Sequence, residues 1–282
     1  MTTTTVFELF FDLVAPLLII LLAAATVILI FVKNSTRSNG MRMLCVQIFT
    51  FFLFGFFNFS AAIISVLGAA HLTTIQQGLL YYLSAADVVS ELFACFAGLL
   101  FAVDRLIAIS SPLKHNFYEV STKLAILTFI FGLVIVAVVC LAYVWFPLLI
   151  PEKLVLSAWF YVFVVIIALE TIAHIAFCAL YRKFVKQQKN LVIQRRNKQT
   201  NQIIMFEVVS QTALCSIPNA FIVANEIISM ERASWIDLLD SLHDVLFTLN
   251  VLLSCMFAFW KLRPRCLRIH GATQHVATSV AT

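Results

Sequence analysis

Seven long apolar stretches divide this chain of 282 residues, and they constrain its fold more than any other feature. A helix needs about 20 apolar residues to cross the hydrocarbon core of a bilayer. Each stretch meets that length, and none has the short alternating pattern of a membrane β-barrel. We therefore expect an all-α, seven-helix membrane bundle over 1–260 and a short basic tail over 261–282. The expected spans are 6–32, 43–70, 79–109, 124–150, 154–181, 203–229 and 235–260.

The composition favours lipid over water as the solvent of these stretches. The chain is 62% hydrophobic and only 12% charged, whereas soluble domains are about 45–50% apolar and about 25% charged. One small soluble domain cannot bury so much apolar surface, which excludes an ordinary soluble protein. The first stretch has no basic segment before it and is too long for the apolar core of a signal peptide. We expect it to be retained as the first span.

Basic residues collect on one side of the predicted spans. Of the 19 Lys and Arg residues, all except Lys153 and Arg232 fall in the tail or in and around the connections after the first, third and fifth spans. An odd number of spans places these regions on one side of the membrane. Because cytoplasmic loops are enriched in Lys and Arg, we expect the N-terminus outside the cell and the C-terminus inside. Attraction to the anionic lipids of the inner leaflet then accounts for the net charge of +5. No basic patch interleaved with aromatic residues indicates a nucleic-acid partner.

Neither the cysteines nor the sequon predicts a structural constraint outside the cell. None of the seven cysteines falls in a predicted outside loop, and there is no CxxC pair, so we expect neither an extracellular disulfide nor a metal site built from cysteine. Cys266 follows the last span among arginines and is a candidate for palmitoylation, with a free cytosolic thiol as the alternative. The sequon over 34–36 falls on the predicted inner side and should be unused.

The most specific motif lies at the end of the third predicted span and reads FAVDRLIAISSPL over 101–113. Its Asp104 and Arg105 fall at the predicted inner membrane boundary, where such a pair also serves as a simple anchor. The whole string resembles the Asp-Arg-Tyr segment, and the Ile-Ala-Ile and Pro-Leu that follow it, in rhodopsin-like G-protein-coupled receptors. In size and plan the chain is most similar to the divergent nematode chemosensory serpentine receptors, with class bc as the expected subclass.

This resemblance implies a rhodopsin-like bundle in the plasma membrane, ciliary in a sensory neuron, with no enzymatic activity and no cofactor. Its partners would be a small-molecule ligand, a heterotrimeric G protein and membrane lipids, and the plan is compatible with oligomers. The resemblance assigns Arg105, with Asp104 beside it, to holding the resting state and contacting the G protein. It also assigns the basic segment 182–202 to the G-protein surface, although the charge bias of inner loops alone explains those residues.

The sixth predicted span carries CSIP over 215–218, which looks like a reduced form of the family's Cys-Trp-x-Pro. Pro218 removes a backbone donor and should kink the helix, which would supply a lever. Prolines are also common in membrane helices without such a role. Leu106 stands in place of the family's tyrosine, Ser216 in place of its tryptophan, and the sequence NVLLS over 250–254 lacks the usual Pro and Tyr. These departures leave the activation mechanism open.

Acidic residues inside the predicted outer half of the bundle suggest where a ligand binds, because ionisable groups within a membrane are expensive and usually functional. Asp87 and Glu91 share one face of the third span, and Asp240, His243 and Asp244 share one face of the seventh. A cationic or hydrogen-bonding ligand is one interpretation. Pairing of the acids with His243 or with the backbone is the other. Glu170 and His174, deeper in the fifth span, are expected to form an internal polar pair.

A transporter is the main alternative, because Glu91, Glu170 and Asp240 could relay protons across the membrane. Against it, the sequence shows no convincing internal repeat, and its 7 glycines are few for helices broken by glycine. A retinal protein needs a lysine within the last span and is excluded, because the only lysine near that span is Lys261, at its inner end. The chain has no HExxH or GxSxG motif of a hydrolase.

Overall fold

The computed structural model describes residues 10–32, 39–68, 74–145, 152–187, 191–228 and 234–263. These residues are almost entirely helical, and no strand occurs among them. Seven of the helices are long and apolar enough to cross a membrane, and each overlaps one predicted span. The prediction of an all-α bundle of seven apolar helices is therefore confirmed.

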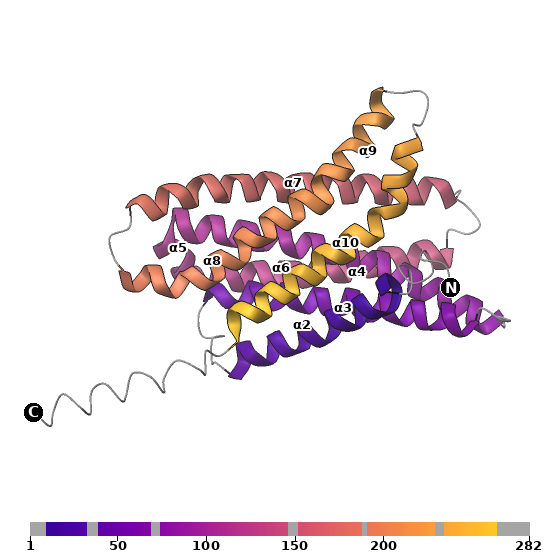
Figure 1. Cartoon of the computed structure of the whole chain (residues 1–282), viewed down its shortest axis with the longest axis horizontal. Helices are drawn as coiled ribbons and strands as arrows, with labels where there is room; N and C mark the ends of the chain where they lie inside the picture. The colour runs from indigo at the N-terminus through magenta and orange to yellow at the C-terminus, as the bar shows by residue number, and fades with distance from the viewer. Residues whose placement is uncertain are drawn as a thin grey trace, which may run out of the picture.

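The helices form an elongated bundle in which successive spans run in alternating directions (Figure 1). In chain order they are η1 (Phe10–Val14), α2 (Ala15–Val32), α3 (Asn39–Gly68), α4 (Thr74–Ser110), α5 (Pro112–Phe117), α6 (Val120–Trp145), α7 (Glu152–Gln187), α8 (Leu191–Gln211), η3 (Thr212–Ser216), α9 (Ile217–Ile228) and α10 (Ser234–Leu262). The first predicted span is η1 with α2, and the sixth consists of α8, η3 and α9, where η marks a π-helical turn.

Helix α4 is the centre of the bundle. It packs against α3, α6 and α7, and its span is the most buried of the seven, whereas that of α6 is the least buried. Helix α2 closes the bundle by packing between α3 and α10. Gly55 lets α2 and α3 approach, because a side chain there would meet Ile19 Cγ2 at 3.0 Å and the carbonyl oxygen of Pro16 at 3.1 Å.

Large apolar side chains cover the outside of the bundle as well as its core. Phe101 and Phe177 are completely buried, but Leu133 on α6 and Ile172 and Ile175 on α7 have more than half of their surface exposed. A soluble protein would not leave so many long aliphatic side chains on helix faces, whereas hydrocarbon solvates them without penalty. The outer surface thus has the character expected of a protein that spans a membrane several times.

The two ends of the bundle differ in the residues that they carry. Helix α2 begins and α10 ends at opposite ends of the molecule, as an odd number of spans requires (Figure 1). We call the end at which α4 finishes, beyond Arg105, the Arg105 end, and the end at which α4 starts the Thr74 end. At the Arg105 end α7 continues to Gln187 and α8 starts at Leu191. Most of the basic segment 182–202 is therefore helical, which suits its many Lys, Arg and Gln residues.

Candidate functional site

The carboxylate of Asp104 joins three consecutive helices at the Arg105 end. Its Oδ2 accepts a hydrogen bond from Arg105 Nε at 2.9 Å. Its Oδ1 lies 2.8 Å from His115 Nε2 on α5 and accepts the hydroxyl hydrogen bond of Ser121 on α6 at 2.5 Å. Asp104 is completely buried, so these partners replace the water that an ionised carboxylate would otherwise need.

Arg105 is held inside the protein and is not a boundary anchor that reaches the headgroups. Only 4% of its surface is exposed, and its guanidinium forms an ion pair with Asp104 while its Cζ lies 6.0 Å from the centre of the Phe101 ring. The carboxylate of the preceding residue thus balances the charge of Arg105. A second contact crosses the same end, where Arg42 on α3 donates to the hydroxyl of Thr122 on α6.

A chain of hydrogen bonds crosses the middle of the bundle and ends on a buried acid. Ser210 donates to Asn250 Oδ1 at 2.6 Å, the Asn250 amide donates to Gln211 Oε1, and Gln211 Nε2 donates to Glu170 Oε2 at 3.1 Å. All four side chains are buried. Glu170 is thus internal as predicted, but its partner is Gln211. The prediction that it pairs with His174 is wrong, because both ring nitrogens of the buried His174 lack a hydrogen-bond partner among the described residues.

A second buried acid lies in the same core, where Gln47 on α3 donates through Nε2 to Glu207 Oε1 on α8. Glu170 and Glu207 are close enough to interact electrostatically. Gly98 on α4 provides the space for this cluster, because a Cβ atom there would lie 3.1 Å from Glu170 Cδ and 3.3 Å from Gln47 Nε2. Sequence reasoning missed Gln47 and Glu207. The acid Glu207 within the sixth predicted span could have indicated a buried polar site. Its partner Gln47 lies 160 positions away in the sequence, so no local pattern connects the two.

Pro218 follows a π-helical turn. At the end of η3 the N–H of Ile217, the first residue of α9, donates to the carbonyl of Thr212, a bond across five residues. Such a turn and a proline each interrupt the regular ladder of backbone bonds and so bend a helix. Ser216 turns its hydroxyl to Thr171 on α7 at 2.6 Å. Ser216 stands where the rhodopsin-like receptors carry tryptophan, and here it makes a polar contact between the fifth and sixth spans.

The acids predicted to contact ligand meet His243 toward the Thr74 end, between α4 and α10. His243 Nδ1 lies 3.8 Å from Glu91 Oε1 and 3.2 Å from Asp244 Oδ1. Asp87 interacts electrostatically with both Glu91 and Asp244. The ring of Phe163 on α7 packs edge-on against the imidazole, with centroids 5.2 Å apart. The structure thus brings Asp87, Glu91 and His243 together.

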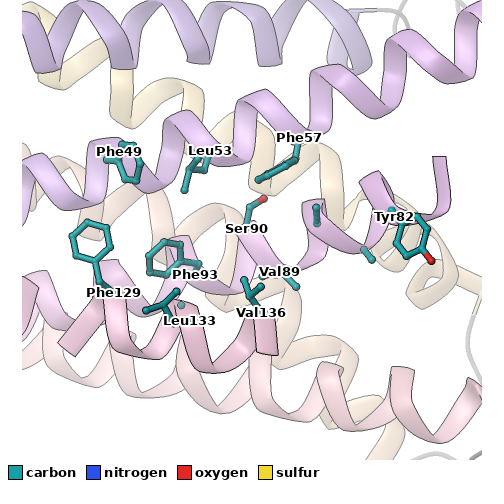
Figure 2. A pocket seen from close by; sticks show the side chains of 13 residues that line it. Phe49, Leu53, Phe57, Tyr82, Val89, Ser90, Phe93, Phe129, Leu133 and Val136 are labelled. Carbon is teal, nitrogen blue, oxygen red and sulfur yellow. The ribbon is translucent and has the colours of Figure 1, made fainter. Parts of the chain in front are cut away.

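A separate apolar pocket of about 470 Å³ lies between α3, α4 and α6. Figure 2 shows Phe49 and Leu53 of α3, Phe93 of α4, and Phe129 and Leu133 of α6 directed into it. Its only polar lining groups are the hydroxyls of Ser90 and Tyr82. Its α4 wall is formed by positions 82, 85, 86, 89, 90 and 93, so Asp87 and Glu91 lie on another face of the helix. Helix α4 therefore separates the pocket from the acidic cluster.

Two predicted residues lie outside what the structure describes. Asp240 belongs to α10, but its side chain is outside the described part. Cys266 lies beyond residue 263, at which the described chain ends. The roles predicted for both stay predictions.

A comparison with known proteins found no family whose sequence pattern matches this chain, and no curated protein matches it significantly.

Proposed function

We propose that this protein is a rhodopsin-like chemosensory G-protein-coupled receptor of the nematode serpentine type. The observation that carries the proposal is the buried Asp104–Arg105 pair, which joins α4 to α5 and α6 at one end of a bundle of seven apolar helices. A structural anchor would face lipid or water. A buried arginine that is paired with a carboxylate at a helix end is instead poised to exchange partners when neighbouring helices move.

The sixth span supplies the moving part of this proposal. The π turn η3 and Pro218 interrupt the backbone hydrogen bonds of this span at the same place along its length. The hydrogen bond between Ser216 and Thr171 connects that place to α7. Ligand that binds more tightly to one arrangement of the span than to the other shifts the population toward it. In this mechanism Arg105 and the basic segment 182–202 then contact the G protein on the cytoplasmic face.

The proposed ligand is a small cationic or hydrogen-bonding molecule that contacts Asp87, Glu91, Asp240 and His243. The first three are acids, and the described members of the group lie together between α4 and α10. The proposal places the Thr74 end outside the cell, the Arg105 end in the cytoplasm and the protein in the plasma membrane. The basic residues of the Arg105 end support that orientation.

The test is ligand-dependent signalling in a heterologous cell screened with mixed small molecules, with wild type, Asp87→Asn and Arg105→Ala compared at matched surface levels. We expect Asp87→Asn to shift the potency of the ligand, and Arg105→Ala to abolish signalling while binding is retained. Ile172→Ala, on the apolar outer face of α7, is the matched control and should behave as wild type. Signalling that survives in Arg105→Ala would contradict the proposal.

A proton-coupled transporter is the second candidate, and the buried acids Glu170 and Glu207 favour it. Glu170 forms a polar path with Gln211, Asn250 and Ser210 through the middle of the bundle, and Glu207 is close enough to Glu170 to interact with it electrostatically. Proton relays in transporters use such buried acids. The same cells test it. Solute uptake that depends on a proton gradient and is lost in Glu207→Gln, without any G-protein signal, would contradict the receptor function and support the transporter.

A further inference from the structure

Glu91, His243 and Asp244 form a constellation of metal-ligand type between α4 and α10, in the half of the bundle toward the Thr74 end. One donor atom from each, two carboxylate oxygens and an imidazole nitrogen, lie within 4.8 Å of one another. We propose that these three residues bind a divalent transition-metal ion, with zinc as the ion of choice. This proposal goes beyond the receptor function and holds equally if the chain is a transporter.

The spacing of the donor atoms fits a four-coordinate ion. Zinc binds nitrogen and oxygen at about 2.0–2.2 Å, and tetrahedral geometry then separates neighbouring ligand atoms by about 3.4 Å. The two distances from His243 Nδ1, 3.8 Å to Glu91 and 3.2 Å to Asp244, bracket that value. The side chain of Asp244 is 88% exposed, so it has room to rotate until its carboxylate oxygen lies at the same spacing from the Glu91 oxygen. Three protein ligands leave a fourth position for water or for a small molecule.

Two buried carboxylate oxygens at this cluster have no hydrogen-bond donor among the described residues. Glu91 Oε1 is sealed from solvent and accepts no hydrogen bond from the described residues, and the same holds for Asp87 Oδ1 on the preceding turn of α4. Asp87 lies close enough to Glu91 and Asp244 to repel both when all three are ionised. The arginines that form ion pairs in the described chain, Arg42 and Arg105, do so with other acids. A divalent ion would neutralise the cluster, with Asp87 beside it as a further source of negative charge.

The imidazole decides the class of metal. Calcium and magnesium take six or more oxygen ligands, whereas zinc and its neighbours accept nitrogen together with carboxylate. Phe163 packs against the His243 ring and limits its rotation, and Glu91 projects from α4, the most buried helix of the bundle. Two of the three ligands are therefore held in place before the metal arrives, which lowers the entropy lost on binding.

Cobalt titration of the untagged full chain in lipid nanodiscs tests the proposal, because tetrahedral cobalt absorbs visible light. We expect one saturating equivalent, displaced by zinc and not by magnesium. His243→Gln and Asp244→Asn should each weaken binding by about tenfold or more. The exposed Asp244 can be changed without disturbing the core, so this variant separates loss of a ligand from loss of the fold.

Asp12→Asn is the matched control. It removes one exposed acid from the start of the first span, at the same end of the bundle, and should bind cobalt as wild type does. Absence of saturable binding in wild type would overturn the proposal. So would equal affinity in wild type and both cluster variants, or an absorption band typical of cysteine-bound cobalt. None of these readouts depends on signalling, so failure here leaves the receptor proposal to its own test.

Discussion

At the scale of single residues, Gly98 is the position where the polar core leaves no room for a side chain. A methyl group there would press on the carboxylate of Glu170, which Gln211 holds in place. We expect Gly98→Ala to lower the free energy of unfolding by about 1–3 kcal/mol, as overpacking does. The midpoint of thermal unfolding of the purified protein in detergent measures this loss.

Gly78→Ala is the control for this substitution. Gly78 is in the same helix, but a methyl group there meets nothing within 4 Å, so the variant should gain up to about 1 kcal/mol of helix propensity. In a Glu170→Ala background the penalty of Gly98→Ala should shrink, because the crowded carboxylate is gone. An unchanged penalty in that background would show that the crowding has another cause.

Asp104 offers a second residue-scale prediction. Asp104→Asn keeps the shape of the side chain but leaves Arg105 buried without a counter-charge, and breaking a buried pair in this way costs about 3–5 kcal/mol. We expect a lower unfolding midpoint, partly restored in the double variant Asp104→Asn, Arg105→Met. Glu119→Gln removes a largely exposed partner of Arg42 and should cost less than about 1 kcal/mol. Similar losses in Asp104→Asn and Glu119→Gln would contradict this account.

At the scale of elements, the sixth span is the irregular one. Because Pro218 has no N–H, the carbonyl of Leu214 loses its usual donor, and the π turn η3 lies beside this gap. We expect the amides of η3 to exchange hydrogen faster than those in the middle of α4. Pro218→Ala should slow this exchange by roughly tenfold or more, since an interior proline weakens a helix by about 3 kcal/mol. Hydrogen exchange followed by mass spectrometry reads this out peptide by peptide.

Pro112→Ala is the matching control, because Pro112 is the first residue of α5, a position where proline replaces no intrahelical bond. Exchange in η3 should be the same in this variant as in wild type. If Pro218→Ala also leaves exchange in η3 unchanged, Pro218 does not weaken the sixth span, and the proposed movement of the span about this residue is contradicted.

The elements were largely predictable from the sequence, but the contacts between them were not. Apolar runs of spanning length mark the helices directly, because length and hydropathy are local properties. The Asp104–Arg105 pair was also predictable, since its members are adjacent. The partners His115 and Ser121, the Gln47–Glu207 bond and the pocket of Figure 2 depend on how helices rotate about their axes. Without the mixed polarity of a soluble amphipathic helix, apolar spans such as α2 give little sign of that rotation.

At the scale of the whole molecule, the distribution of charge predicts how the bundle sits in the membrane. All but two of the 19 basic residues are predicted on one side of the membrane, the side of the Arg105 end, and α2 begins at the opposite end from the one at which α10 finishes. Moving these loops across a bilayer would work against both the positive-inside bias and the attraction of the inner leaflet, which is about 1 kcal/mol for each basic residue near the surface. The N-terminus should therefore lie outside.

Epitope tags at the two termini test this orientation in whole cells. We expect antibody to reach the N-terminal tag on intact cells and the C-terminal tag only after permeabilisation, and we expect the sequon over 34–36 to stay unglycosylated. A sequon inserted after Lys153, on the other side, is the positive control and should add a glycan that a glycosidase removes. If both tags were accessible from the same side, the chain would cross the membrane an even number of times. That result would contradict both the count of seven spans and the charge argument, because only an odd number of spans places the basic connections and the tail on one side.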